Sequence, residues 1–313
     1  MACIALKVDV DTLRGTCEGV PRLVRLFERM EVRATFLFSL GPDHTGWALR
    51  RAFRPGFASK VARTSVLRHY GLRTLLYGVA LPAPDIGRRG APAMRMARTA
   101  GHECGLHAWD HVVWQDHVRG RDAAWTRHQM QLAWDRYVDV IGEAPATHGA
   151  AGWQMNAAAF RQLDAWGLAY ASDGRGPAPF VPVVDGETLN HVQLPTTLPT
   201  LDELIGLDGV DEANVADALL RRTATDDDQV FTLHAELEGG LFAPALEDLL
   251  HGWTAQGHRL VPLEDLHRQL DRASLARVEP GWGAVPGRSG ELVVAEGPVH
   301  PHGRTEGRRI PCI

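Results

Sequence analysis

Short apolar segments alternate along this chain with longer segments in which apolar residues recur every three or four positions. The first such pair is the apolar run at 3–10 followed by 20–30, where apolar residues repeat at helical spacing and charged residues occupy the other face. Strands that alternate with helices are typical of parallel sheets joined by crossover helices. This alternation restricts the fold to the α/β class.

The same pattern continues to about residue 270. Closing parallel strands of this number on themselves predicts an α/β barrel of seven or eight strands. Further strands are expected at 34–38, 103–107, 147–149, 168–172, 192–194, 230–234 and 259–261, with helices at 123–141, 156–166, 215–222 and 243–256.

Composition excludes several other classes of protein. The chain carries 33 Lys and Arg against 38 Asp and Glu, a formal net charge of -5, which argues against a nucleic-acid partner. Its 4 cysteines lack C-x-x-C spacing, so neither a disulfide framework nor a thiolate zinc site is indicated. No apolar run approaches the ~20 residues of a membrane span, and the N-terminus lacks the pattern of a signal peptide. We expect a cytosolic protein, or one peripheral on the cytosolic side of a membrane.

Two regions depart from the alternation. Residues 44–84 contain no Asp or Glu but several arginines and aromatic residues, a composition that suits the surface of an anionic membrane. A pair of helices that merely caps the barrel is the alternative, and Arg is the ordinary cation of this chain, which has only two Lys. Residues 274–313 are rich in Gly and Pro and predict a flexible tail. We therefore expect one domain over 1–273 with an insertion at about 44–84.

Acidic and imidazole side chains follow two of the expected strands. Asp9 and Asp11 lie at the end of the first strand, where parallel α/β barrels build their active sites. His107 and His111 follow another strand and are four residues apart, a spacing that places both imidazoles on one face of a helical turn. Asp11 with two histidines would hold a metal ion and leave positions free for water and substrate. A D-x-D pair alone also fits a helix cap or an aspartyl phosphatase.

Two further strand ends carry residues of interest. His234 ends the strand at 230–234 and is expected to point to the same rim of the barrel. Asp173 and Arg175 lie in SDGRG after another strand, where the alternative is a turn with a surface ion pair. Nearby acidic residues have either solvated or supporting roles: Glu103, Asp110, Glu236 and Glu238.

Taken in this order, the segments resemble the polysaccharide deacetylase, or NodB-homology, family. The similarity covers about residues 4–270 and is carried by KVDVDTLRGTCEGVPRL, GLHAWDHVVWQ, AAGW, SDGRG, QLPTTLPTLDELIG and TLHAELEG. The resemblance implies a distorted seven-stranded (β/α) barrel and a metal-dependent hydrolase of amide bonds. These sequence segments most resemble the branch of the family that deformylates an undecaprenyl-phosphate-linked formamido-arabinose in lipid A modification.

The resemblance also implies roles for individual residues. Asp9 would be the general base and His234 the general acid, with Asp173 as the acidic residue that orients His234. Asp11, His107 and His111 would hold one divalent metal ion, and zinc, cobalt, nickel, manganese and iron all accept such ligands.

One motif departs from the family pattern. Many deacetylases have an arginine that steadies the base, whereas this chain has AAGW at 150–153. We expect Arg175 to substitute for it and Trp153 to contact the substrate. In the insertion, Arg50, Arg51 and Arg54 are expected to bind the phosphate of the substrate at the cytoplasmic face of the inner membrane.

Three other functions stay open at this point. An N-deacetylase of another amino sugar or polysaccharide would use the same chemistry, because formyl and acetyl differ by one methyl, which is worth only ~1 to 3 kcal/mol of discrimination. An aspartyl phosphatase would leave the two histidines without a role. A non-catalytic protein that binds a lipid-linked sugar is the non-enzymatic alternative.

Overall fold

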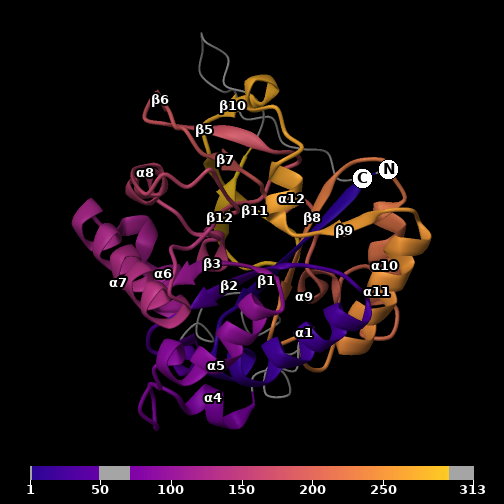
Figure 1. The fold of residues 1–313 in the computed structure, drawn as a ribbon, viewed down its shortest axis with the longest axis horizontal. Helices are drawn as coiled ribbons and strands as arrows, with labels where there is room; N and C mark the ends of the chain where they lie inside the picture. The colour runs from indigo at the N-terminus through magenta and orange to yellow at the C-terminus, as the bar shows by residue number, and fades with distance from the viewer. Residues whose placement is uncertain (1, 49–70, 296–313) are drawn as a thin grey trace.

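A parallel sheet forms the centre of the protein, whose computed structural model describes residues 2–48 and 71–295 (Figure 1). This sheet runs in the order β3 (Glu103–Ala108), β2 (Thr35–Ser39), β1 (Cys3–Val10), β8 (Gln229–His234). The first residues of β1 also pair with β9 (Arg259–Val261).

The sheet closes into a barrel through short and irregular pairings. Leu106 of β3 forms a parallel bridge with His148, and the His148 carbonyl accepts a hydrogen bond from Ser172 N at 2.8 Å. Ser172 follows β4 (Tyr170–Ala171), which pairs in parallel with β7 (Val192–Gln193). The chain beyond β7 returns to β8, where Thr197 N donates to the Val230 carbonyl at 3.1 Å. The ring β8, β1, β2, β3, 147–149, β4, β7 is the distorted seven-stranded barrel expected from the resemblance.

The two faces of β1 differ in polarity because successive side chains point to opposite sides of a strand. Ile4, Leu6, Val8 and Val10 are fully buried in the apolar core under the surrounding helices. Lys7 and Asp9 lie on the other face, in register with Thr35 and Leu37 of β2. The barrel interior is therefore polar, and this is where functional side chains gather.

The helices form an outer layer around the barrel (Figure 1). The sequence does not predict α5 (Ile86–Thr99), because small residues such as Gly87, Gly90 and Ala97 make much of its buried face instead of large apolar ones. The principal helices are α1 (Val20–Arg29), α5 (Ile86–Thr99), α7 (Ala123–Ile141), α8 (Ala157–Ala165), α10 (Val215–Leu220) and α11 (Ala243–Ala255); shorter ones are α4 (Leu72–Leu76), α6 (His111–His117), α9 (Leu201–Leu204) and α12 (Leu263–His267).

The structure corrects the prediction of a flexible tail for residues 276–294. Arg175 N donates to the Val293 carbonyl at 2.9 Å, and Ala295 N donates back to the Arg175 carbonyl at 2.8 Å. β10 (Ala276–Val278) pairs in parallel with β5 (Phe180–Val184), which also pairs with β6 (Glu187–Thr188). β11 (Gly281–Ala284) and β12 (Glu291–Val294) pair with each other as a separate hairpin. Gly287 lies in the turn of this hairpin with a φ of 80°, and a Cβ there would lie 2.2 Å from the Glu203 carbonyl oxygen.

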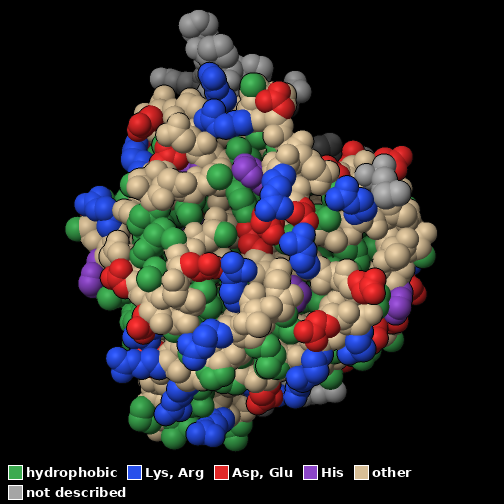
Figure 2. All heavy atoms as spheres, in the orientation of Figure 1, with side chains coloured by type: hydrophobic (Ala, Val, Ile, Leu, Met, Phe, Trp, Pro, Cys, Tyr) green, Lys and Arg blue, Asp and Glu red, His purple; other side chains and the backbone are tan. Residues whose placement is uncertain are grey.

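Charges of both signs are mixed on the face drawn in Figure 2, where acidic side chains near the centre lie next to basic ones. Within 2–48 and 71–295, no helix combines the length and the apolar character needed to cross a bilayer. The predicted basic insertion is described only at 44–48 and 71–84, and its remainder lies outside the described residues.

Candidate active site

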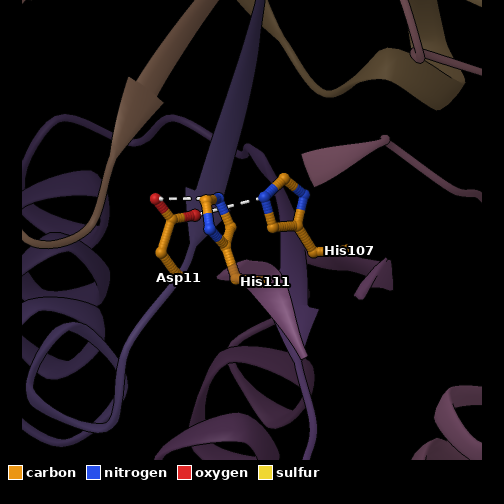
Figure 3. A group of neighbouring side chains, drawn as sticks. All are labelled: Asp11, His107 and His111. Atoms are coloured by element: carbon orange, nitrogen blue, oxygen red, sulfur yellow. Dashed lines mark ion pairs between the residues drawn. The ribbon is translucent and has the colours of Figure 1, made fainter. Parts of the chain in front are cut away.

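Asp11, His107 and His111 converge at the rim of the barrel (Figure 3). Asp11 Oδ1 lies 3.1 Å from His107 Nε2, and Asp11 Oδ2 lies 3.4 Å from His111 Nε2. His107 belongs to β3 and His111 is the first residue of α6, so the spacing of four spans a strand end and a helix start rather than a helical turn. The three ligand atoms lie within 4.8 Å of one another, close enough to share one ion.

The donor set fits a divalent metal. His107 Nδ1 donates to the Gly149 carbonyl at 2.7 Å, so Nε2 is the ring nitrogen that faces the Asp11 carboxylate. A positive charge belongs between this nitrogen and the carboxylate: a proton on Nε2 in the metal-free protein, or a divalent ion in its place. Burial would raise the pKa of Asp11, but the charges of His111 and His107 hold that pKa well below its usual range, so the carboxylate is ionised. Three protein ligands leave positions open, as hydrolytic metal sites require.

Glu236 fixes the loop that carries Asp11. Its Oε1 accepts hydrogen bonds from Asp11 N at 3.1 Å and from both the N and the Oγ1 of Thr12 at 2.8 Å. Gly15, which opens a short π-helical turn, makes room for this carboxylate, because a Cβ there would lie 1.9 Å from Glu236 Oε1. Burial, together with the charge of Asp11, raises the pKa of Glu236. The sequence analysis leaves a solvated or a supporting role open for Glu236, because its partners lie more than 220 residues away in the chain.

Asp9 and His234 face the same space from neighbouring strands. They are register partners across β1 and β8, so their side chains leave the sheet side by side on its interior face. Asp9 is 3% exposed and His234 is 9% exposed, at the mouth of the barrel beside the three candidate ligands. His234 Nδ1 is buried without a hydrogen-bond partner among the described residues. The positions suit one group that accepts a proton and another that donates one.

Lys7 is a site residue that the sequence analysis did not find. Its side chain is fully buried, and its Nζ lies 3.2 Å from Asp9 Oδ2. Nζ also lies 5.3 Å from the centre of the Trp153 ring. The signal was a lone lysine inside an apolar strand, two positions before Asp9 and hence on the same face.

The resemblance implied that Asp173 orients His234, but in the structure the Asp173 carboxylate bonds to other residues. Its Oδ1 accepts from His148 Nδ1 at 2.6 Å, and its Oδ2 accepts from Gln193 Nε2 at 2.7 Å. Burial would raise the pKa of Asp173, but the charge of His148 and these hydrogen bonds hold it below its usual value. Instead, Glu238 holds the His234 backbone by accepting from His234 N at 2.7 Å. Both carboxylate oxygens of Asp173 are therefore used by other partners.

Arg175 does not steady Asp9 either. Its Nη1 pairs with Glu203 Oε1 at 2.7 Å, and the same oxygen accepts from Arg288 Nε at 2.6 Å. The Arg175 side chain also donates to the carbonyls of Thr196 and Leu198. The cation is committed to holding the chain after β7 and the hairpin of β11 and β12 against the barrel.

Trp153 lies next to the predicted acid. Its ring meets His234 edge to face with centroids 6.5 Å apart, and its Nε1 donates to Thr196 Oγ1 at 3.1 Å. Arg288 lies over the ring at 4.2 Å. The residue is 2% exposed, so any contact with substrate would use a narrow edge of the ring. The predicted substrate ligands Arg50, Arg51 and Arg54 lie outside the described residues.

A probable 4-deoxy-4-formamido-L-arabinose-phosphoundecaprenol deformylase ArnD from Shewanella sediminis is 35% identical to the chain over 270 residues, covering 86% of this chain and 87% of that protein. The chain belongs to the ArnD deformylase family. A second probable ArnD deformylase, from Wigglesworthia glossinidia brevipalpis, is 29% identical over 279 residues and covers 88% of this chain and 96% of that protein. No family model matches the chain.

Superposition on solved structures identifies the fold type of this chain. A putative polysaccharide deacetylase from Mycobacterium smegmatis superposes with a TM-score of 0.60 at 16% identity, covering 88% of this chain and 93% of its own. A probable polysaccharide deacetylase from Pseudomonas aeruginosa gives 0.55 at 17% identity, covering 85% and 90%. Puue allantoinase gives 0.56 at 15% identity, covering 85% and 89%. The barrel is therefore of the polysaccharide deacetylase type.

Proposed function

We propose that this protein hydrolyses the formamide of undecaprenyl-phosphate 4-deoxy-4-formamido-L-arabinose to formate and the free 4-amino sugar. Membership of the ArnD family supports the substrate. The observation that carries the reaction is the cluster of Asp11, His107 and His111 beside Asp9 and His234. The amine so formed is cationic at neutral pH, and on lipid A it offsets phosphate charge, a basis for resistance to cationic peptides such as polymyxin.

The reaction requires one proton to be removed and another to be delivered. Asp9 accepts a proton from water while the water oxygen adds to the formyl carbon. His234 then delivers a proton to the nitrogen as the carbon–nitrogen bond breaks. Because the two residues are register partners on neighbouring strands, both side chains can reach the same bound amide. Asp9 thus acts as base and His234 as acid.

Asp11, His107 and His111 would hold one divalent ion, such as zinc, cobalt, nickel, manganese or iron. When bound, such an ion polarises the formyl oxygen and lowers the pKa of water. Gly149 and Glu236 keep the ligands in place through the His107 ring and the Asp11 backbone. This support is what a metal site needs beyond its direct ligands.

Because the polyprenyl tail of the substrate lies in a bilayer, the enzyme must meet its substrate at a membrane surface. We propose that the protein is peripheral on the cytoplasmic face of the inner membrane. Leu72 is 66% exposed and Val79 is 60% exposed in the described part of the acid-free region 44–84. Exposed apolar side chains among arginines suit an anionic bilayer. Co-sedimentation with anionic vesicles tests this: the wild type should bind, and a triple alanine variant of Arg50, Arg51 and Arg54 should bind less. Equal binding of the two would refute the role of these arginines.

Mass spectrometry of the lipid-linked formamido sugar tests the reaction. After chelation the protein should be inactive, and added zinc, cobalt or manganese should restore loss of the formyl group. Asp9→Asn and His234→Ala should each lower kcat by about 10² to 10⁴. Asp135→Asn and His128→Ala are matched controls, because both side chains are exposed on α7; they should retain full activity.

The outcomes separate the alternatives. Turnover of an acetylated sugar instead of the formylated one would identify an N-deacetylase. Tight binding without any turnover, unaffected by His234→Ala, would identify a non-catalytic binding protein.

A further inference from the structure

Lys7 is a fully buried cation in the middle of the barrel. Its Nζ makes no hydrogen bond within the described residues, and its ion pair there is with Asp9 at 3.2 Å. Burying an ammonium group is costly unless an opposite charge compensates it. The lysine is therefore held in this place together with Asp9.

The strand and its neighbours shape the space for this side chain. Lys7 and Asp9 are two positions apart on β1, so both point to the barrel interior. Gly149 leaves room for the lysine stem, because a Cβ there would lie 2.9 Å from Lys7 Cε. The Trp153 ring lies 5.3 Å from Nζ, within the range of a cation–π interaction. The ammonium group is thus confined between a carboxylate and an indole.

We propose that Lys7 is the positioning residue for Asp9. Its ammonium group holds Oδ2, which directs the other oxygen, Oδ1, toward the space beside His107. Among residues 2–48 and 71–295, Oδ1 has no hydrogen-bond partner, and it lies 3.9 Å from His107 Nδ1. Lys7 thereby takes the role of the arginine that steadies the base in many deacetylases. This chain lacks that arginine at 150–153, and Arg175 does not contact Asp9. Because its side chain is 0% exposed, Lys7 does not touch the substrate and acts only through Asp9. The inference rests on the proposed role of Asp9 as the base.

Lys7→Met, which keeps the length of the side chain but removes its charge, is the main test. We expect kcat to fall about 100-fold, the size of effect that misplacing a reacting group by about 1 Å produces, with KM changed less than about threefold. The visible spectrum of the cobalt-loaded protein and its cobalt affinity should stay as in the wild type, because Lys7 holds none of the three ligands. Lys7→Ala should regain activity when ethylammonium is added, and Lys7→Arg should keep more activity than Lys7→Met.

Thr35→Val is the matched control. Thr35 is the register partner of Lys7 on β2, is fully buried, and bonds to Glu103 rather than to Asp9. This variant should lose stability yet keep its kcat. An equal fall of kcat in Thr35→Val, a changed cobalt spectrum in Lys7→Met, or a kcat of Lys7→Met within about threefold of the wild type would each overturn the proposal. The ratios are measured on whichever amide the wild type hydrolyses, so a wrong substrate shows in the wild type and a wrong role for Lys7 shows only in the variants.

Discussion

Glu103 makes the stability of the fold depend on pH. The residue begins β3 and is 6% exposed, and its carboxylate accepts hydrogen bonds from Thr35 Oγ1 at 2.5 Å and from Glu264 N at 3.1 Å. Burial raises the pKa of Glu103 from its usual 4.5 to about 7, against the effect of these hydrogen bonds and of one from Tyr170. The carboxyl is therefore easier to keep protonated in the folded protein than in the unfolded chain.

The sign and size of the effect follow from proton linkage. Because the pKa is higher in the folded state, this state binds more protons between about pH 4.5 and pH 7. The contribution of Glu103 to stability is complete below the unfolded pKa and is lost as the pH rises through the folded one. The rise of the Glu103 pKa from 4.5 to about 7 corresponds to a loss of about 3 kcal/mol in the free energy of unfolding.

Glu103→Gln isolates this contribution, because glutamine stays neutral at every pH. We expect the free energy of unfolding of the wild type, minus that of Glu103→Gln, to fall by about 3 kcal/mol between pH 4 and pH 8. Urea denaturation of the metal-free protein, followed by tryptophan fluorescence at constant ionic strength, measures both values. Glu291→Gln is the control, since Glu291 is 50% exposed and paired with Arg119, and its difference from the wild type should not vary with pH. A difference for Glu103→Gln that stays constant within about 1 kcal/mol would refute the reasoning.

Three further predictions concern the supports of the site. Gly15→Ala should displace Glu236 from the loop of Asp11 and weaken metal affinity about 10- to 100-fold, as measured by chelator competition; unchanged affinity would show that Glu236 does not hold the ligand. Glu203→Gln should destabilise the protein by about 3 to 5 kcal/mol in urea, because it removes the carboxylate that pairs with the buried Arg175; a loss below about 1 kcal/mol would contradict this. Asp173→Ala should cost about 1 to 3 kcal/mol of stability by removing the acceptor of His148, with kcat retained at a temperature where the variant is folded; a selective loss of kcat would restore the role of Asp173 in orienting His234.

Local patterns in the sequence were enough to predict most of the barrel and the cluster of Asp11, His107 and His111. The alternation of strands and helices is a local property, so β1 at Cys3–Val10, α7 at Ala123–Ile141 and β9 at Arg259–Val261 have the predicted bounds. Asp11 and His107 could be expected at one rim because the ends of parallel strands meet there. Their proposed role as metal ligands rests on the residue types.

Which polar groups pair with one another was decided by the tertiary structure. Lys7 reads in the sequence as an interruption of an apolar strand, and only barrel closure places it between Asp9 and Trp153. Asp173 and Arg175 share the turn at 172–176, yet their partners His148 and Glu203 come from segments 25 and 28 residues away. The same holds for residues 276–294, whose composition suggests a flexible chain but in which β10 pairs with β5 and the Val293 carbonyl accepts from Arg175 N. Periodicity in the sequence indicates which side of a strand or helix is buried. An ion pair depends instead on which distant segment lies opposite, and this is known only once the barrel has closed.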